Sequence, residues 1–155
     1  MTNLNFSISE LIHSDNAIKA GIDNTPTIKE IDNLLNLIFY CLQPIRDKLK
    51  KPMIITSGYR NMKVNFLAGG AINSQHLKGE AADFHVNGMT IQQVINFIIK
   101  SGVEFDELIN EKNKWVHISF SKGKNRKKSP LKGGKTTQSG DNESIDKISN
   151  YTILN

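Results

Sequence analysis

The chain has 155 residues, of which 38% are hydrophobic and 23% are charged, which is enough for one hydrophobic core. Its net charge is +5, its single cysteine excludes an intramolecular disulfide framework and a cysteine-built zinc site, and no segment approaches the ~20 apolar residues that span a bilayer. Residues 1–9 show neither the basic nor the apolar region of a secretory signal, so we expect synthesis in a reducing cytoplasm.

The N-terminal part of the chain predicts helices. Ser7-Ile-Ser-Glu10 has the pattern of a capping box, so a short helix should begin there and a loop should follow through Gly21–Pro26. A second capping box, Thr27-Ile-Lys-Glu30, precedes apolar residues at three- and four-residue spacing, which predicts an amphipathic helix of about five turns. Pro44 should kink this helix or end its regular part.

The following residues predict a mixture of strands and helices. Short β-rich segments indicate strands at 53–56, 81–86, 107–110 and 115–120, with a hairpin loop joining the last two. Helices are expected at 61–67, stopped by Gly69-Gly70, and from the capping residue Thr90 to Gly102. Because strands and helices alternate unevenly and the chain closes on a hairpin, we predict an α+β fold.

Positive charge is concentrated at the C-terminal end. Residues 121–155 hold eight basic and three acidic residues, whereas the first 120 residues are neutral overall. We predict a folded domain over residues 1–136 and a polar, flexible tail over residues 137–155. A solubilising tail is the ordinary interpretation, and contact with anionic cell-wall polymers is the alternative. Nucleic-acid binding is disfavoured, since no aromatic residues interleave the lysines.

Two predicted strands place an acid and a histidine on a polar face. Strand alternation directs Asp83 and His117 to the face opposite the apolar residues of their strands. If these strands are neighbours, the preceding loop can bring His76 to both. Two imidazoles and one carboxylate form a three-ligand zinc set that leaves a fourth position for water. Taken singly, His76 is an ordinary loop histidine and His117 an ordinary hydrogen-bonded core histidine.

Hydrolysis at such a centre also needs a carboxylate that transfers protons. Glu111, six residues before His117, is our candidate, and Glu107 and Glu80 are weaker ones. Arg60 ends the Ser-Gly-Tyr-Arg turn, where its guanidinium can hold a substrate carboxylate or an oxyanion.

Several segments together resemble the zinc D-Ala-D-Ala carboxypeptidase family, which includes phage endolysins and shares its fold with the hedgehog signalling domain. They are Ser57-Gly-Tyr-Arg-Asn61, Val64-Asn65, Gly69-Gly70, Ser74-Gln-His-Leu-Lys-Gly-Glu-Ala-Ala-Asp83 and Trp115-Val-His-Ile-Ser119. The resemblance covers about residues 6–135. It implies a small antiparallel sheet flanked by helices, one zinc ion held by His76, Asp83 and His117, and catalytic roles for Glu111 and Arg60. Many relatives carry the glutamate three residues before the last histidine, where this chain has Lys114.

The sequence therefore predicts a zinc-dependent peptidase that hydrolyses amide bonds of peptidoglycan stem peptides or cross-links, as a carboxypeptidase or an endopeptidase. We expect a monomer that acts on the cell wall after release, during phage lysis or from the virion. The alternative is a catalytically inactive, zinc-containing binding or structural module of the same fold, which Lys114 at the usual base position motivates.

Overall fold

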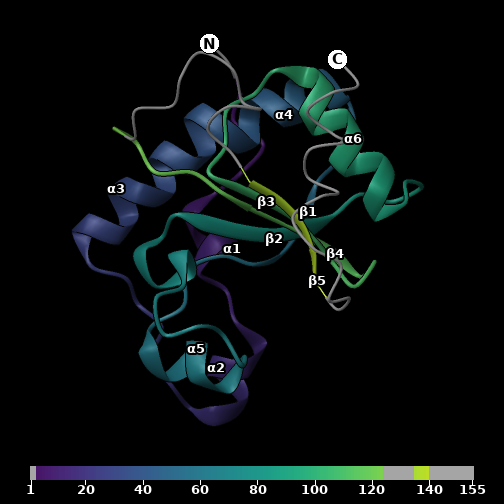
Figure 1. Cartoon of the computed structure of the whole chain (residues 1–155). Helices are drawn as coiled ribbons and strands as arrows, with labels where there is room; N and C mark the ends of the chain where they lie inside the picture. Colours follow the sequence, from purple (N-terminus) through teal and green to yellow (C-terminus); the bar gives the residue numbers. More distant parts are fainter. Residues whose placement is uncertain (1–2, 124–134, 140–155) are drawn as a thin grey trace.

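The computed structural model describes residues 3–123 and 135–139 of the chain (Figure 1). Its helical elements are α1 (Ile8–Ile12), α2 (Asp15–Ala20), α3 (Ile28–Leu37), the π-helical η1 (Ile38–Leu42), α4 (Gln43–Leu49), α5 (Met62–Leu67), the 3₁₀-helical η2 (Gln75–Lys78) and α6 (Ile91–Ser101). Its strands are β1 (Ile54–Ser57), β2 (Ala81–His85), β3 (Glu107–Glu111), β4 (Trp115–Ser119) and β5 (Lys135–Ser139).

The strands form one sheet in the order β1-β2-β4-β3-β5. The first four are antiparallel to their neighbours, and β5 is parallel to β3. Lys112 and Asn113 make the tight β3–β4 turn with positive φ angles, a conformation that asparagine tolerates well. The prediction of an α+β fold with a small antiparallel sheet flanked by helices is confirmed.

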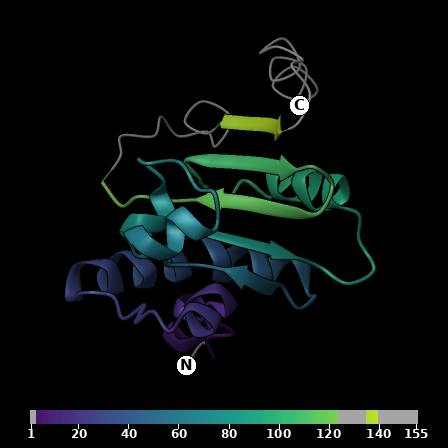
Figure 2. The ribbon, with the colours of Figure 1, turned by 90° about the horizontal axis from the view of Figure 1, so that it is seen from below.

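One face of the sheet carries the hydrophobic core. The helices α3, η1, α4 and α6 lie behind the strands, while α5 and η2 lie in front of them (Figure 2). The core joins apolar residues of these rear helices to alternate residues of the central strands. Its members from the strands are Ala82, Phe84, Leu108, Val116 and Ile118, each fully buried. The opposite face is therefore free for polar side chains.

Side-chain caps define where several helices begin. Ser7 accepts a hydrogen bond from the backbone N–H of Glu10, and both Thr27 and Thr90 form the reciprocal capping box. The first predicted helix is in fact two helices, because Ser14 caps the additional helix α2. This second helix was not predicted, although serine is one of the residue types that favour an N-cap.

The long predicted helix changes its hydrogen-bonding pattern before Pro44. The regular α-helix ends at Leu37, a π-helical turn follows, and α4 then continues to Leu49. A proline has no backbone N–H to donate to the preceding turn, and the wider turn accommodates this loss without ending the helix. The expected disturbance is present, but it takes the form of a π-helical segment.

The C-terminal predictions fall largely outside the described residues. The predicted domain boundary after residue 136 lies within β5, a strand that the sequence did not suggest. Residues 124–134 and 140–155 lie outside the described part of the chain, so the flexible tail stays a prediction. In the described part, none of the helices is both long and apolar enough to cross a bilayer.

Candidate metal centre

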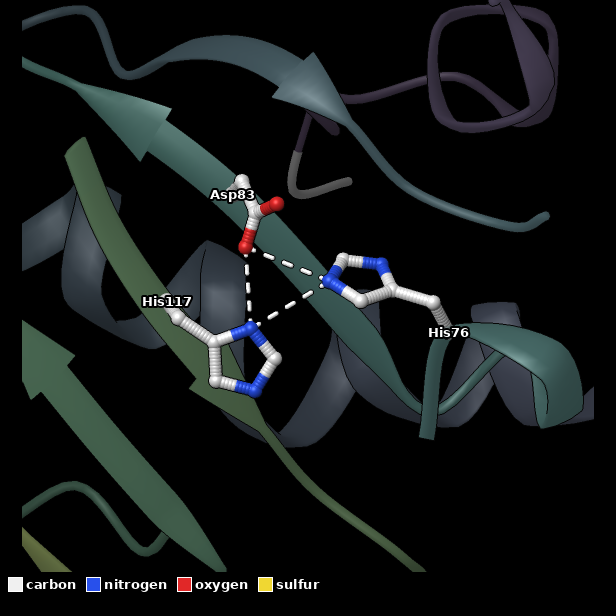
Figure 3. A group of neighbouring side chains, drawn as sticks. All are labelled: His76, Asp83 and His117. Carbon is white, nitrogen blue, oxygen red and sulfur yellow. Dashed lines mark hydrogen bonds and ion pairs between the residues drawn. The ribbon is translucent and has the colours of Figure 1, made fainter. Parts of the chain in front are cut away.

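Three side chains from separate segments meet on the polar face of the sheet (Figure 3). His76 comes from η2, Asp83 from β2 and His117 from β4. The Oδ1 atom of Asp83 lies 3.2 Å from Nε2 of His76 and 2.9 Å from Nδ1 of His117, and these two nitrogens are 3.2 Å apart. The structure thus brings together the three residues that the sequence suggested as metal ligands.

The pairing of β2 with β4 sets the positions of Asp83 and His117. These two residues are direct partners across the two strands. Their neighbours along each strand point into the core and are buried, namely Ala82, Phe84, Val116 and Ile118. Because side chains alternate along a strand, burial of these neighbours directs Asp83 and His117 to the opposite face.

Local hydrogen bonds fix the third residue, His76. The Ser74 hydroxyl accepts a bond from the backbone N–H of His76, and the Arg60 N–H donates to the His76 carbonyl at 3.1 Å. Gly79 ends η2 in the left-handed conformation, with a φ of 70° that favours glycine. The short helix therefore presents His76 toward the paired strands from one end of the site.

The turn after β1 selects the tautomer of His76. Its Nδ1–H donates to the Gly58 carbonyl at 2.6 Å, so Nε2 keeps its lone pair toward Asp83 and His117. Gly58 packs closely on α1, because a Cβ atom there would lie 2.1 Å from the Leu11 carbonyl oxygen. A backbone carbonyl that orients the remote nitrogen is the usual partner of a metal-binding histidine.

The spacing of the three donor atoms fits a small divalent cation. Ligand atoms about 2.0–2.2 Å from a tetrahedral zinc ion are about 3.3–3.6 Å from one another. The three separations here, 3.2, 3.2 and 2.9 Å, are a few tenths of an ångström shorter, which a small outward movement of the side chains would match. Two imidazoles and a carboxylate are borderline and hard donors that zinc accepts, and that other divalent metals accept too. The residues present therefore fit a three-ligand metal site.

Arg60 is bound to one of these residues. Its Nη2 donates to Oδ2 of Asp83 at 2.9 Å, and its Nε donates to the Ser57 hydroxyl at 2.9 Å. The guanidinium thus holds the carboxylate oxygen that faces away from both imidazoles. The sequence predicted that Arg60 contacts substrate or transition state, which stays a prediction; its bond to Asp83 was not foreseen.

The surroundings favour the protonation states that a metal requires. Burial lowers the pKa of His76 below the ordinary value, although Asp83 partly opposes this shift. Burial alone would raise the pKa of Asp83, but attraction to His76 and hydrogen bonds with both imidazoles hold it well below its usual range. An unprotonated imidazole and an ionised carboxylate are the forms in which these groups bind metals.

A cleft of about 500 Å³ opens over the three residues. Its walls are Arg60, the backbone-rich segment 68–71, Trp115 and the outward face of β3. The β3 face contributes Glu107, Ile109 and Glu111. The cleft is therefore large enough for a few residues of a peptide, with the candidate ligands on its floor.

Two of the three predicted carboxylates line this cleft. Ile109 is the partner of His117, and Glu107 and Glu111 lie two residues from it in opposite directions. Glu80 does not line the cleft, because its oxygens accept hydrogen bonds from Gln75 and Ser121. Lys114 lies in the turn before β4, where its N–H donates to the Glu111 carbonyl.

The remaining histidines lie apart from the cleft. His85 ends β2 as the partner of Ile54, and His13 forms an exposed pair with Asp15. The contributions of Ile109 and of the 68–71 segment to the cleft were not predicted from the sequence. Strand alternation directs Ile109 outward once its pairing with His117 is known. The sequence alone does not reveal which residue of β4 pairs with Ile109.

Acidification is expected to destabilise the metal-free protein. Because the pKa of His76 is lower in the folded state than its ordinary value of 6.5, the unfolded chain binds more protons as the pH falls below 6.5. The depressed pKa of Asp83 acts in the same direction below its ordinary value of 3.8. Urea denaturation of chelator-treated protein should show stability falling by at most about 1.4 kcal/mol per pH unit for each group.

Two variants locate the source of this pH dependence. His76→Gln should flatten the decline just below pH 6.5, since it removes the buried titrating group. His13→Gln, on an exposed side chain, should leave the decline unchanged. A decline that persists in His76→Gln would contradict the assignment.

Comparison with known proteins gives one family match. The model of the family described as Peptidase M15 matches residues 4–119, a range that contains the whole cleft. No curated protein matches the chain.

Proposed function

The chain belongs to the peptidase M15 family of zinc-dependent metallopeptidases, and from this premise we propose that it hydrolyses amide bonds in the stem peptides or cross-links of peptidoglycan. The single observation that carries this proposal is the convergence of His76, Asp83 and His117 on the floor of a peptide-sized cleft. Three ligands leave a coordination position open, which is the pattern of a catalytic rather than a structural zinc site.

The three residues would hold one divalent ion, most simply zinc. When bound, such an ion acts as a Lewis acid that polarises the scissile carbonyl and acidifies the attacking water. The chain supplies the remaining groups. His76 and His117 present ring nitrogens to one point, and Arg60 keeps the Asp83 carboxylate oriented toward that point through Oδ2.

We propose Glu111 as the general base. It lines the cleft beside Trp115, its partner across β3 and β4. The opposite end of the site is occupied by η2, since Gln75 donates to Asp106 next to Glu107. The Glu111 carboxylate would take a proton from water as oxygen bonds to the carbonyl carbon, then give it to the amine as the C–N bond breaks.

Arg60 has a second proposed role at the edge of the cleft. Its guanidinium remains within reach of the cleft while it binds Asp83, since it lines the same cavity. A cation placed there can bind a substrate carboxylate or the oxyanion that forms during hydrolysis.

We place this activity at the cell wall, during phage lysis or on the virion, on the strength of the resemblance to wall peptidases. We also propose that the protein is a monomer and that its basic C-terminal end contacts anionic wall polymers, since residues 121–155 hold eight basic and three acidic residues.

Digestion of purified sacculi tests the function directly. The metal-loaded protein should lower the turbidity of a sacculus suspension, and a chelator should prevent this. Mass spectrometry of the released muropeptides identifies the bond, because loss of a terminal residue indicates a carboxypeptidase and separation of cross-linked peptides an endopeptidase. Unchanged muropeptide masses with fully metal-loaded protein would reject the proposal and favour the inactive module.

A further inference from the structure

One wall of the cleft is built from four small residues. This segment, residues 68–71, is called the glycine wall here and has the sequence Ala-Gly-Gly-Ala. A second cavity of about 590 Å³, lined mostly by residues of α5, adjoins the same segment, because Gly70 lines both cavities. In the described part of the chain, a Cβ atom on Gly69 would find no atom within 4 Å. Side-chain packing therefore contributes little to the position of the wall.

Hydrogen bonds hold the glycine wall instead. The N–H groups of residues 68 and 69 close the last turn of α5. Beyond that turn, Asn65 supplies two bonds, since its Nδ2 donates to the Ala71 carbonyl and its backbone carbonyl accepts from the Gly70 N–H, both at 2.9 Å. The Ala71 carbonyl also accepts from the N–H of Ser74, the residue that caps η2. Asn65 thus ties the wall both to α5 and to the turn before η2.

The burial of Asn65 leaves one polar atom unsatisfied. The residue is 2% exposed, and within the described residues its Oδ1 has no hydrogen-bond partner. A buried amide oxygen without a donor destabilises the folded state, and leucine, which has a similar size, would avoid that cost. What asparagine provides and leucine cannot is the bond from Nδ2 to the wall.

Gly70 is fitted to the same side chain. A Cβ atom at position 70 would overlap the Oδ1 atom of Asn65, so glycine is the residue that this amide orientation allows. Gly69 has a φ of 69°, in the left-handed region that glycine adopts without strain. Both glycines and Asn65 belong to the segments that carry the family resemblance, yet the proposed mechanism uses none of them.

We propose that Asn65 is a positioning residue that sets the width of the substrate cleft by holding the glycine wall in place. This inference rests on the proposed peptidase function and assigns Asn65 to substrate binding. Asn65 does not itself line the cleft, so it acts through the wall. His76 is also held by the Gly58 carbonyl and by the Arg60 N–H, so a displaced wall should weaken substrate binding and leave the metal centre intact.

Asn65→Ala removes the bond from the side chain to the wall. KM for muropeptides released from purified sacculi should rise about tenfold, as expected for one lost hydrogen bond, while kcat and metal content stay at wild-type values. Asn96→Ala makes the same chemical change at an exposed position of α6 and should leave KM unchanged. A wild-type KM in Asn65→Ala, or a loss of kcat and metal at unchanged KM, would overturn the inference.

Gly70→Ala tests the same contact from the wall and leaves the residues of α5 unaltered. Its methyl group would overlap Asn65 Oδ1 and displace the wall, so KM should again rise, and a wild-type KM in this variant would by itself overturn the inference. In the Asn65→Ala background the oxygen is absent, so Gly70→Ala should add little. If the two effects multiply in the double variant, the wall is not positioned by Asn65.

Hydrogen exchange and equilibrium binding separate this inference from the proposed function. In Asn65→Ala the amides of residues 70–74 should exchange faster than in the wild-type protein, while those of β2 and β4 keep their rates. Titration calorimetry of the same muropeptides with metal-loaded Glu111→Gln and Asn65→Ala/Glu111→Gln reports affinity without turnover.

Faster exchange and weaker binding in the Asn65 variants, found together with no hydrolysis by the wild-type protein, would sustain the inference and reject the peptidase function. Hydrolysis by the wild-type protein, with equal muropeptide affinity in the two calorimetry variants or unchanged exchange of residues 70–74, would overturn the inference and keep the function.

Discussion

Replacing His117 with alanine is expected to abolish stoichiometric metal binding and to lower peptide hydrolysis by at least about a thousandfold, because the metal contributes several kcal/mol to the transition state. His117 lies on β4, a different strand from Asp83, and its Nδ1 is within 3.2 Å of both other donor atoms. Its removal leaves two ligands from η2 and β2, too few for a stable catalytic zinc site.

His85 provides a matched control for this substitution. It is on the same strand face as Asp83, two residues further along β2, but it does not line the cleft. His85→Ala removes the same chemical group from the same sheet and should retain one ion per chain. Metal content by elemental analysis and the rise in Tm on adding zinc measure the effect independently of activity. Equimolar zinc retained by purified His117→Ala would disprove the ligand assignment.

The same two strands show how far the sequence predicts the site. Alternation alone places Asp83 and His117 on one polar face, because apolar residues at 82, 84, 116 and 118 must be buried together. If the two strands are neighbours, their register decides whether Asp83 and His117 meet. The sequence supplied the periodicity, and the structure supplied the pairing.

Features that depend on tertiary contact were not predictable in this way. The bond from Arg60 to Asp83 links residues 23 positions apart, and the bond from His76 to the Gly58 carbonyl links residues 18 positions apart. Neither has a periodic signal, since they depend on how the turn after β1 packs against β2 and against η2. The parallel strand β5 likewise follows from pairing with β3 and not from its own polar composition.

Strand periodicity alone does not distinguish the two carboxylates of β3, although the sequence favoured Glu111 as the general base. Glu107 and Glu111 lie on the same face of β3, and each is two residues from Ile109, which pairs with His117. The two ends differ in that η2 packs near Glu107, where Gln75 donates to the neighbouring Asp106. We propose Glu111 as the general base, and the kinetics of variants at both positions test this assignment.

Glu111→Gln should lower kcat for muropeptide hydrolysis by about a hundredfold to ten-thousandfold, the usual contribution of a general base. Glutamine has nearly the same shape as glutamate but cannot accept the proton of the attacking water. Metal content should be unchanged, because Glu111 is not among the three convergent donors. The substitution thus separates proton transfer from metal binding, which His117→Ala cannot do.

Glu104→Gln is the matched control for Glu111→Gln, because Glu104 is an exposed residue just before β3 that lies outside the cleft. It should leave kcat and metal content at wild-type values. A wild-type kcat in Glu111→Gln together with a collapse of kcat in Glu107→Gln would instead make Glu107 the general base. Because both glutamates lie on the same strand, such a result would mean that water approaches from the η2 end, against the packing of Gln75 on Asp106.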